Sequence, residues 1–356
     1  MVRTPGVGLA AVQADPGRAG EELLRAAKSA TTLPNQLQER LLDILFVMDP
    51  PETMHPEKDT SFAFMRGAQA RGHRCYHCLV HHVYCDGGAV RAVARPIAVS
   101  AAAPHHSLGA PVDSALADFA AVFIRKDPPF DRAYSHLTRL LDLARGQTLV
   151  INDPQGIRDA NEKLFAFRFA RFMPQTLVTA DPEHIQQFVE RVGGRAILKP
   201  LDGAGGSGVV VIGRGDPNTR ALVGLLTRDG RRLAMVQEFL PDIRNGDKRV
   251  LVLDGEVLGA ILRVPRSDDV RANIHVGGEV RPTDLSDTEL TMIAEVGAEL
   301  RRSGLWFVGL DLIAGRLIEV NVTSPTGLQE LGRHHAKAFE EEVIAWVEAR
   351  VHATHC

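Results

Sequence analysis

A lysine followed by a glycine-rich loop between two apolar runs is the feature that most constrains the fold of this chain. The stretch AILKPLDGAGGSGVVVI, residues 196–212, places Lys199 in the first apolar run and then four glycines within six residues. The loop matches G-x-G-x-x-G, but the dinucleotide-binding form of that pattern needs a helix directly after it. Here the β-branched run VVVI follows, which predicts a strand. The stretch therefore predicts a β-hairpin with a glycine loop and argues against a dinucleotide site.

A glycine hairpin of this kind can fold over phosphate groups. Glycine adopts positive φ and lets backbone N–H groups approach anionic oxygens closely. The alternative is a surface turn without function, but four glycines lose backbone entropy on ordering and return no packing. We therefore predict a phosphate-binding element formed by Lys199, Gly203, Gly205, Gly206, Ser207 and Gly208.

Composition limits the classes of partner. The chain has 356 residues, of which 45% are hydrophobic and 24% charged, as expected for a soluble globular protein of two or three domains. Its net charge of −3 gives no reason to expect a nucleic acid partner. No apolar run approaches the roughly 20 residues of a membrane helix, so we expect no membrane association. Residues 1–40 predict a weakly structured extension with a helix around EELLRAAKSA, and no function follows from them.

Three cysteines, Cys75, Cys78 and Cys85, lie close to four histidines, which raises a zinc site as an alternative. The segment RCYHCLV predicts a strand, however, and its period-two alternation sends Cys75 and Cys78 to opposite faces. No glycine or proline lies between them to form the tight turn that a chelate needs. We predict ordinary reduced cysteines in a cytoplasmic protein, and stoichiometric zinc after purification would contradict this prediction.

Two apolar runs that end in charged, proline-containing loops organise the first part of the chain. LLDILFVMD, residues 41–49, predicts a buried parallel strand, SFAFMRGAQARG a helix and RCYHCLV a second strand, which together form a βαβ unit. AAVFIRKDPPF, residues 120–130, is a further strand that ends in a charged loop. Ligand crevices of open α/β sheets lie at the carboxyl ends of strands, so we expect MDPPE and RKDPPF to face one site. For either loop alone, the alternative is a connecting loop without a ligand.

From about residue 158 the pattern changes. NEKLFAFRFARF predicts a helix that carries Lys163. Strands are then predicted at TLVTA, AILKPLD, VVVIGR and LAMVQEFL, with helices at DPEHIQQFVERV and NTRALVGLLTRD. Two hairpins follow, KRVLVLDGEVLGAILRV with its turn at Asp254-Gly255, and LWFVGLDLIAGRLIEVNV.

These pieces in this order resemble the ATP-grasp ligases: a lysine in NEKL, a lysine before a glycine hairpin, an acidic strand end in VQEFL, and an aspartate followed by a Glu-x-Asn pair. The closer resemblance is to bacterial glutathione synthetases. It is carried, from about residue 41 to beyond residue 330, by MDPPE, KDTSF, RKDPPF, NEKLF, ILKPLDG, NGDKRVLVLDGE, FVGLDLI and EVNVTSPTG. The N-terminal extension lies outside the resemblance.

The resemblance implies an α/β fold with an N-terminal, parallel-sheet, Rossmann-like substrate domain over residues 41–157 and an ATP-grasp domain over residues 158–352. It gives Lys163 and Lys199 contacts with the phosphates of ATP, which is a co-substrate, and the glycine hairpin covers these phosphates. It places the adenine against the backbone of Glu238, Phe239 and Leu240, and adds Asp247 to the ATP site. The alternative for Lys199 alone is a strand-end cation that extends into solvent.

Asp311, Glu319 and Asn321 form the predicted metal set. Glu319 and Asn321 are two positions apart and share one strand face. A three-residue connection at residues 314–316 would place Asp311 opposite Glu319, whereas a two-residue turn would point them to opposite faces. Oxygen ligands of this kind suit Mg²⁺, with Mn²⁺ as an alternative.

The reaction that the resemblance implies has two steps. A carboxylate attacks the γ-phosphorus of ATP to form an acyl phosphate, and an amine then displaces phosphate to form an amide. Both reactants of the first step are anions, so catalysis depends on positioning and charge neutralisation. By the resemblance, Arg249 contacts the transferring phosphate or the acyl phosphate, and Arg263 lies nearby. Arg271 is given a substrate contact within a predicted lid over residues 265–278. An exposed strand-edge charge is the alternative for Arg249.

The segment Thr323–Gly327 could hold a peptide carboxylate or the incoming amino acid, and a helix N-cap is the alternative. The resemblance predicts ligation of γ-glutamylcysteine to glycine in a homo-oligomer. Two alternatives remain at this point: a ligase for another dipeptide or amino acid, and an ATP-binding sensor without ligase activity. The joint presence of two lysines, an arginine and a metal set argues against the sensor, which does not need a full phosphoryl-transfer set.

Overall fold

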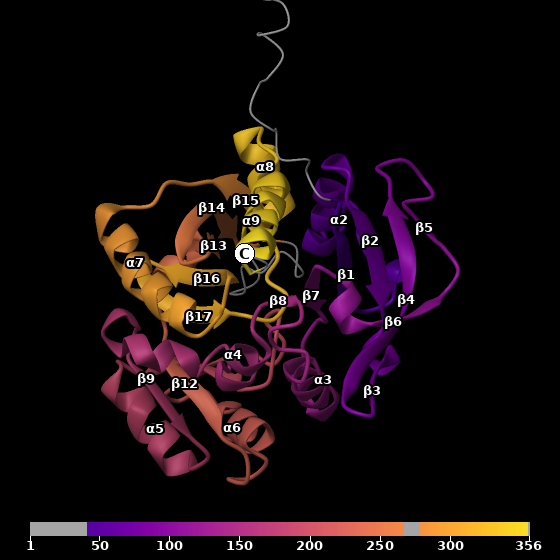
Figure 1. Ribbon diagram of the computed structural model, residues 1–356. Coiled ribbons are helices and arrows are strands. Elements are labelled where there is room, and N and C mark those ends of the chain that lie inside the picture. Colours follow the sequence, from indigo (N-terminus) through magenta and orange to yellow (C-terminus); the bar gives the residue numbers. More distant parts are fainter. Residues whose placement is uncertain (1–40, 267–277, 355–356) are drawn as a thin grey trace, which may run out of the picture. The chain divides into compact units, whose positions relative to one another are not determined.

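Buried parallel strands organise the first part of the computed structural model, which describes residues 41–266 and 278–354 (Figure 1). β1 (Asp43–Met48) pairs in parallel with β2 (Arg74–Cys78) and with β7 (Ala121–Arg125), and β7 pairs in parallel with β8 (Leu149–Ile151). The helix α2 (Thr60–Ala70) connects β1 to β2. The predicted βαβ unit is therefore confirmed.

Both faces of these parallel strands are covered. Ile44 and Phe46 of β1 pack in one hydrophobic cluster with α2, whereas Leu45 and Val47 pack in another with α3 (Arg132–Asp142). Burial on both faces explains why β1 is apolar at almost every position. The same alternation places Cys75 in the α2 cluster and Cys78 in the α3 cluster, so these two cysteines face opposite sides of the sheet, as predicted.

Antiparallel strands extend this sheet beyond β2, and the sequence analysis had assigned none of them. β4 (Ala89–Val99) pairs antiparallel with β2, and three further strands pair antiparallel with β4: β3 (Val83–Asp86), β5 (His106–Leu108) and β6 (Val112–Ala115). β3 and β4 are joined at Gly87-Gly88, where both glycines have the positive φ that a tight hairpin turn requires. The expected parallel sheet is thus parallel only across β2, β1, β7 and β8.

A smaller antiparallel sheet carries the lysine and glycine hairpin of residues 196–212. Its strand order is β11 (Val210–Gly213), β10 (Arg195–Pro200), β12 (Ala234–Glu238) and β9 (Thr176–Thr179). Ala196 and Leu198 pack against α5 (Pro182–Arg191) and α6 (Thr219–Thr227) in one hydrophobic cluster. Because side chains alternate along a strand, Lys199 lies on the opposite face, which these helices leave uncovered.

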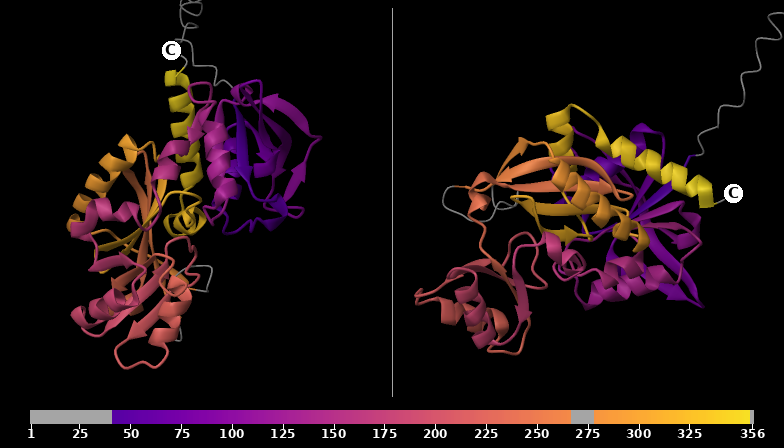
Figure 2. Two further views of the ribbon diagram at one scale, coloured as in Figure 1. Left: turned by 90° about the horizontal axis from the view of Figure 1, so that it is seen from below. Right: turned by 90° about the vertical axis from the view of Figure 1, so that its left-hand side faces the viewer.

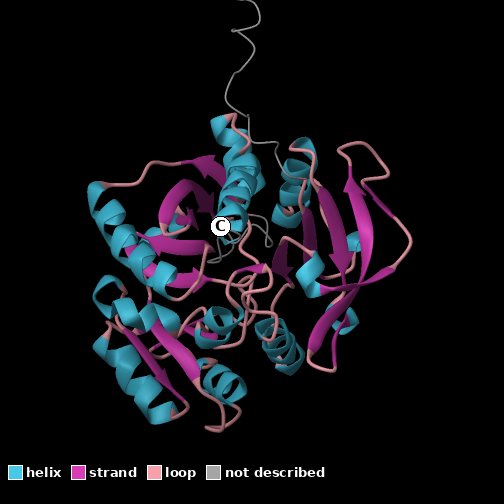
Figure 3. Cartoon of the chain, in the orientation of Figure 1, coloured by secondary structure: helices cyan, strands magenta, loops and turns pink. Residues whose placement is uncertain are grey.

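A larger antiparallel sheet forms the centre of the second part. Its strand order is β15 (Glu279–Pro282), β14 (Glu256–Val264), β13 (Asp247–Leu253), β16 (Phe307–Ile313) and β17 (Arg316–Asn321). α7 (Asp287–Arg302) covers one face and packs on Val250 and Leu310. Figure 3 shows this helix beside the strands of the sheet. The opposite face carries Leu251 and Arg249, and α8 (Leu328–His335) packs on its apolar part.

The last described helix, α9 (Phe339–Thr354), packs on the N-terminal part of the described chain. It packs against α2 in one hydrophobic cluster, and Arg66 of α2 forms an ion pair with Glu340 at 2.6 Å. Figure 2 shows α9 as a long helix that leads to the C-terminal end of the described chain. None of the helices in the described residues combines the length and apolar character that a membrane crossing requires.

Short helical segments complete the described chain, and one of them corrects a prediction. Lys163 does not lie on a helix: it lies in a turn before the 3-10 segment η4 (Phe165–Phe172), whose Phe169 has non-helical φ and ψ. The other short segments are η1 (Pro51–Thr53), η2 (Val80–His82), η3 (Leu116–Asp118), α4 (Pro154–Asp159) and η5 (Pro241–Asn245).

Candidate functional site

The hairpin of β16 and β17 brings two carboxylates together by a route that the sequence analysis did not foresee. The turn has two residues, Ala314 and Gly315, both with positive φ. Such a turn alone would point Asp311 and Glu319 to opposite faces. A β-bulge at Ile318 inserts one extra residue into β17, and Asp311 is paired directly with Glu319 as a result. The expectation for a two-residue turn was therefore wrong, because it assumed an unbroken register.

Asp311 lies at the centre of a buried charge cluster. Arg249 donates to both of its carboxylate oxygens, at 2.6 and 3.1 Å, and Arg263 lies 3.1 Å from Oδ2. Arg263 also donates to both oxygens of Asp247, at 2.6 and 2.7 Å. Burial alone would raise the pKa of Asp311, but the two guanidinium groups outweigh burial and hold this pKa below its ordinary value. Asp311 therefore stays ionised in the protein interior.

Two buried lysines face the same side of the site. The Nζ of Lys163 lies 2.9 Å from Glu319 of β17 and donates to the carbonyl of Gly203 at 2.6 Å. Lys163 thus connects β17 to the glycine loop. The Nζ of Lys199 donates to Gln237 at 2.8 Å, a neutral partner on the neighbouring strand. Burial lowers the pKa of Lys199 to about 8. Burial would also lower the pKa of Lys163, but the charge and hydrogen bond of Glu319 together with the charges of Glu162 and Asp202 outweigh burial and raise this pKa.

A first pocket lies between the smaller sheet and the hairpin of β16 and β17. It brings together most of the residues predicted for the ATP and metal sites: Lys163, Lys199, Gly203, Gly205, Gly206, Ser207, Glu238, Phe239, Leu240, Asp247, Asp311 and Glu319. Gly208 does not line this pocket, although its positive φ of 71° shapes the loop. A Cβ on Gly203 would lie 2.7 Å from Pro200 and 2.8 Å from the carbonyl of Ser207, so the loop has no room for a side chain there.

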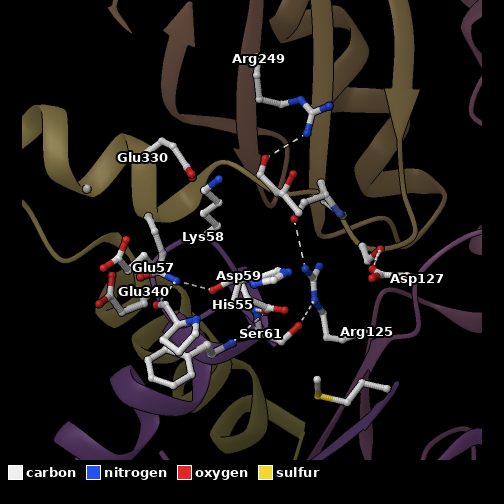
Figure 4. Close-up of a pocket in the computed structure, with 18 of the residues that line it drawn as sticks. His55, Glu57, Lys58, Asp59, Ser61, Arg125, Asp127, Arg249, Glu330 and Glu340 are labelled. Atoms are coloured by element: carbon white, nitrogen blue, oxygen red, sulfur yellow. Dashed lines mark hydrogen bonds between the residues drawn. The ribbon is translucent and has the colours of Figure 1, made fainter. Parts of the chain in front are cut away.

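A second, larger cavity of about 1560 Å³ lies between the first part of the chain and the larger sheet. Asp49 of MDPPE and Arg125 and Asp127 of RKDPPF all line it, so the two loops face one cavity as predicted. Lys126 bridges the loops through an ion pair with Asp49 at 3.0 Å. Arg249 and Arg263 line the same cavity from the larger sheet. Figure 4 shows Arg249 and Arg125 projecting towards the segment that follows β17 from two sides.

Glu319 lines both the first pocket and the large cavity, as do Ala204 and Gly205 of the glycine loop. Asn321 lines only the large cavity, and Asp311 only the first pocket. The metal set therefore marks the boundary between the two spaces. A group bound in the first pocket can meet a group bound in the cavity at this boundary.

Family models identify both parts of the chain. The N-terminal domain of prokaryotic glutathione synthetase matches residues 42–158, and the ATP-grasp domain of prokaryotic glutathione synthetase matches residues 162–336. The chain belongs to the prokaryotic glutathione synthetase family. The family predicted from the sequence motifs is thus confirmed.

Curated relatives agree with this family, and solved structures agree with its fold. A glutathione synthetase of Thermosynechococcus vestitus is 40% identical over 86% of this chain and 99% of its own length, and one of Shewanella oneidensis is 40% identical over 82% and 93%. Among solved structures, D-cycloserine synthetase DcsG has a TM-score of 0.61 at 16% identity and covers 86% of this chain and 99% of its own. ATP-grasp ligase PsnB, in a complex with a minimal precursor, Mg and ADP, has a TM-score of 0.57 at 19% identity, over 90% and 100%. These likenesses show the ATP-grasp fold, as predicted.

A divalent metal, as ATP-grasp enzymes use, fits the donor set of this family member. Asp311 and Glu319 supply carboxylates from directly paired positions. Asn321 donates through Nδ2 to the carbonyl of Gly309 at 3.2 Å, which leaves its amide oxygen as the end available to a cation. Hard divalent cations prefer oxygen ligands of this kind. The chemistry of the residues therefore agrees with the predicted metal set.

Sequence reasoning assigned no role to Glu162, which also lines the large cavity. Its carboxylate accepts a hydrogen bond from Thr323 at 2.8 Å, and its backbone carbonyl accepts one from Val320 at 3.0 Å. Burial, together with the charge of Glu319, raises the pKa of Glu162 to about 7. Glu162 thus attaches the NEKLF turn to β17 and to the segment that follows it. Its position next to Lys163 in that motif was the one signal in the sequence.

One predicted site residue cannot be placed. Arg271 and the central part of the predicted lid, residues 267–277, lie outside the described residues.

Proposed function

We propose that this chain is an ATP-dependent ligase that joins γ-glutamylcysteine to glycine and forms glutathione, ADP and phosphate. The observation that carries the proposal is the boundary at Glu319, where a pocket with two lysines and a glycine loop adjoins a cavity large enough for a peptide. Relatives at about 40% identity over most of the chain are named glutathione synthetase, which supports the choice of substrates.

In the first step, an oxygen of the cysteine carboxylate attacks the γ-phosphorus of ATP. The bond between this phosphorus and the β,γ-bridging oxygen breaks, and ADP leaves with the electron pair. Lys163 and Lys199 would neutralise the phosphates from the first pocket, while Arg249 and Arg263 face the transferring group from the cavity. A bound Mg²⁺ held by Asp311, Glu319 and Asn321 would supply further neutralisation of phosphate charge.

In the second step, the amine of glycine attacks the carbonyl carbon of the acyl phosphate. Phosphate leaves with one oxygen of the original carboxylate, and the amine loses a proton as the amide forms. No nucleophilic side chain is required in either step. The large cavity supplies the space in which the carboxylate and the amine are held close together, and such positioning accounts for much of the rate of a two-substrate reaction.

The finer assignments belong to the same proposal and rest on the resemblance to the family. They comprise Mg²⁺ in preference to Mn²⁺, adenine against residues 238–240, a substrate contact by Arg271, and an ATP role for Gly208. They also comprise a domain boundary near residue 158, a homo-oligomeric state and a cytoplasmic location. The described charge cluster around Asp311 supports the roles of Arg249 and Arg263, because both guanidinium groups are held beside the metal set.

Phosphate release coupled to mass spectrometry tests the proposal. The protein is incubated with ATP, Mg²⁺, γ-glutamylcysteine and glycine, and each component is omitted in turn. We expect phosphate release to require the dipeptide and the mass of glutathione to appear only in the complete mixture. Turnover with a different carboxylate or amine, and none with these substrates, would overturn the substrate assignment while retaining the ligase.

A further inference from the structure

Arg125 is a buried arginine that forms no ion pair with any residue in the ranges 41–266 and 278–354. It lies at the end of β7 with 5% of its surface exposed, and it lines the large cavity. Arg249 and Arg263, which line the same cavity, are equally buried but form ion pairs with Asp311 and Asp247. Within the described part of the chain, no carboxylate forms an ion pair with Arg125. The cavity thus contains a buried cation whose charge the described residues leave unpaired.

The contacts of Arg125 fix its orientation without neutralising it. Its Nε donates to the hydroxyl of Ser61 at 3.0 Å, and one terminal nitrogen donates to the carbonyl of Pro325 at 3.2 Å. Its guanidinium carbon lies 5.6 Å from the ring centre of Phe64. A guanidinium group has five N–H donors in a rigid fork, so two neutral acceptors leave donors for a further partner. This geometry suits a carboxylate, which a guanidinium binds through two parallel hydrogen bonds.

Electrostatics lead to the same requirement. A charge removed from water without a partner destabilises the protein. Burial lowers the pKa of Arg125, and the charges of Asp59 and Asp127 oppose this effect from a distance. Asp59 is already engaged as the N-cap of α2, where it accepts from the backbone of Ser61 and Phe62. An anion bound from the cavity would supply a neutralising charge that no described residue supplies through an ion pair.

We propose that Arg125 and Ser61 form a receptor for the α-carboxylate of the γ-glutamyl group, at the end of the peptide substrate that does not react. The proposal rests on the function proposed above and deepens it. Asp127, which also lines the cavity and accepts from Ser324 at 2.6 Å, would face the neighbouring ammonium group. The cavity then recognises both charges of an α-amino acid end group.

The segment between β17 and α8 separates this receptor from the reacting end. Arg249 donates to the carbonyl of Thr326 at 3.0 Å, and Arg125 donates to the carbonyl of the preceding residue, Pro325 (Figure 4). A dipeptide with one carboxylate at each end can therefore have its reacting carboxylate near Arg249 and its distal carboxylate near Arg125.

The γ-glutamyl group suits this receptor better than glycine does. The ammonium of the γ-glutamyl group takes no part in the reaction and keeps its charge, so the neighbouring side chain of Asp127 would stabilise it. The amine of glycine must lose its proton before it attacks, and an adjacent carboxylate would hold that proton in place. Arg125 with Asp127 beside it therefore suits the charged end of the dipeptide better than it suits glycine.

Substrate analogues combined with substitutions test the proposal. In Arg125→Met, we expect the KM for γ-glutamylcysteine to rise by about 100-fold, with a much smaller change in kcat and in the KM for ATP and for glycine. An analogue in which hydrogen replaces the α-carboxylate should show the same rise on the unsubstituted protein and no further rise on Arg125→Met. For an analogue that lacks only the α-ammonium, the KM should still be about 100-fold higher with Arg125→Met than with the unsubstituted protein.

Three controls separate recognition from folding. Arg74→Met applies the same substitution to an exposed arginine of β2 that pairs with Asp43, and it should leave every KM unchanged. Arg125→Lys keeps the charge without the fork and should restore part of the affinity. The thermal midpoint of Arg125→Met should be unchanged or raised, because the substitution removes an unpaired buried charge.

Equal KM values for γ-glutamylcysteine in the two proteins would overturn the proposal, as would a rise confined to the KM for glycine. The proposal would also be overturned if the KM for the analogue without the α-carboxylate were higher with Arg125→Met than with the unsubstituted protein. Calorimetric binding of γ-glutamylcysteine with a non-hydrolysable ATP analogue covers the case in which the unsubstituted protein makes no glutathione. If that protein binds the dipeptide and Arg125→Met binds it equally well, the receptor alone fails. If the unsubstituted protein neither binds nor converts it, the proposed function fails as well.

Discussion

The two sides of the large cavity treat buried charge in opposite ways. On the larger sheet, Arg249 and Arg263 share Asp311 and Asp247, so the charges are balanced before any substrate arrives. On the parallel sheet, Arg125 is just as buried and has only neutral hydrogen-bond acceptors among the described residues. The paired side is assembled by folding alone, whereas the unpaired side is completed by a ligand. Stability measurements should therefore respond to the first side, and substrate affinity to the second.

The largest effect on stability should follow from breaking the paired side. Asp311→Ala leaves Arg249 without its carboxylate and Arg263 with Asp247 alone. Removing one partner of a buried pair typically costs about 3–5 kcal/mol. Urea unfolding should show a loss of this size, together with the loss of ligase activity. Arg125→Met, measured alongside, should show no loss of stability, and equal losses in the two variants would remove the distinction between the two sides.

A large effect on rate should follow from removing the charge of Lys163, which connects β17 to the glycine loop. Lys163→Met should lower kcat by about 10²–10³-fold, because it deletes a donor aimed at developing phosphate charge. Lys248→Met serves as the control, because Lys248 pairs with Glu289 and lines neither the first pocket nor the large cavity. Steady-state kinetics on both variants decide the matter. A kcat for Lys163→Met within a factor of a few of the control would contradict a catalytic role for Lys163.

ATP affinity should depend on pH through Lys199. Burial lowers the pKa of this lysine from 10.5 to about 8, so the lysine is mostly charged near pH 7 and loses its charge as pH rises through about 8. Since phosphates bind the charged form, the Kd for ATP should rise above that pH by up to about tenfold per pH unit. Calorimetric titrations between about pH 7 and pH 10 measure this slope. Lys199→Met should bind ATP weakly at every pH and lose the slope, and a slope that persists in this variant would assign it to another group.

The smallest of these effects should come from the glycine loop. An alanine at Gly203 would place its Cβ 2.7 Å from Pro200 and 2.8 Å from the carbonyl of Ser207. Overpacking of this kind costs about 1–3 kcal/mol, so Gly203→Ala should raise the KM for ATP by about tenfold. Gly224→Ala in α6 is the matched control, because its Cβ would meet only a flexible aspartate side chain at 3.2 Å. An unchanged KM in Gly203→Ala would show that the loop adjusts freely.

Local patterns in the sequence predicted much of the fold. The alternation in RCYHCLV predicted that Cys75 and Cys78 face opposite sides of the sheet, and the structure places them in two different hydrophobic clusters. The Asp254-Gly255 turn predicted the hairpin of β13 and β14, which the register confirms. The MDPPE and RKDPPF loops were predicted to meet because the carboxyl ends of parallel strands share an edge, and both line the large cavity.

Other features depend on register and tertiary contacts that local patterns do not encode. The bulge at Ile318 is invisible to a count of alternating positions, yet it decides that Asp311 faces Glu319. NEKLFAFRFARF has aromatic residues at helical spacing, but its backbone leaves helical geometry at Phe169 and Lys163 lies in the preceding turn. Arg125 was visible as a residue of the RKDPPF loop. That none of the described carboxylates forms an ion pair with it could be learned only from the structure.

Transfer of an isotopically labelled oxygen tests the central claim most directly, namely that the carboxylate of the peptide is phosphorylated at the boundary between the two pockets. The cysteine carboxylate of γ-glutamylcysteine is labelled with ¹⁸O, and the phosphate released during turnover with ATP and glycine is analysed by mass spectrometry. The account predicts that each phosphate carries one labelled oxygen, because phosphate leaves with an oxygen of the original carboxylate. Unlabelled phosphate, released while glutathione forms, would contradict an acyl-phosphate route and with it the roles given to Lys163, Lys199, Arg249 and Arg263.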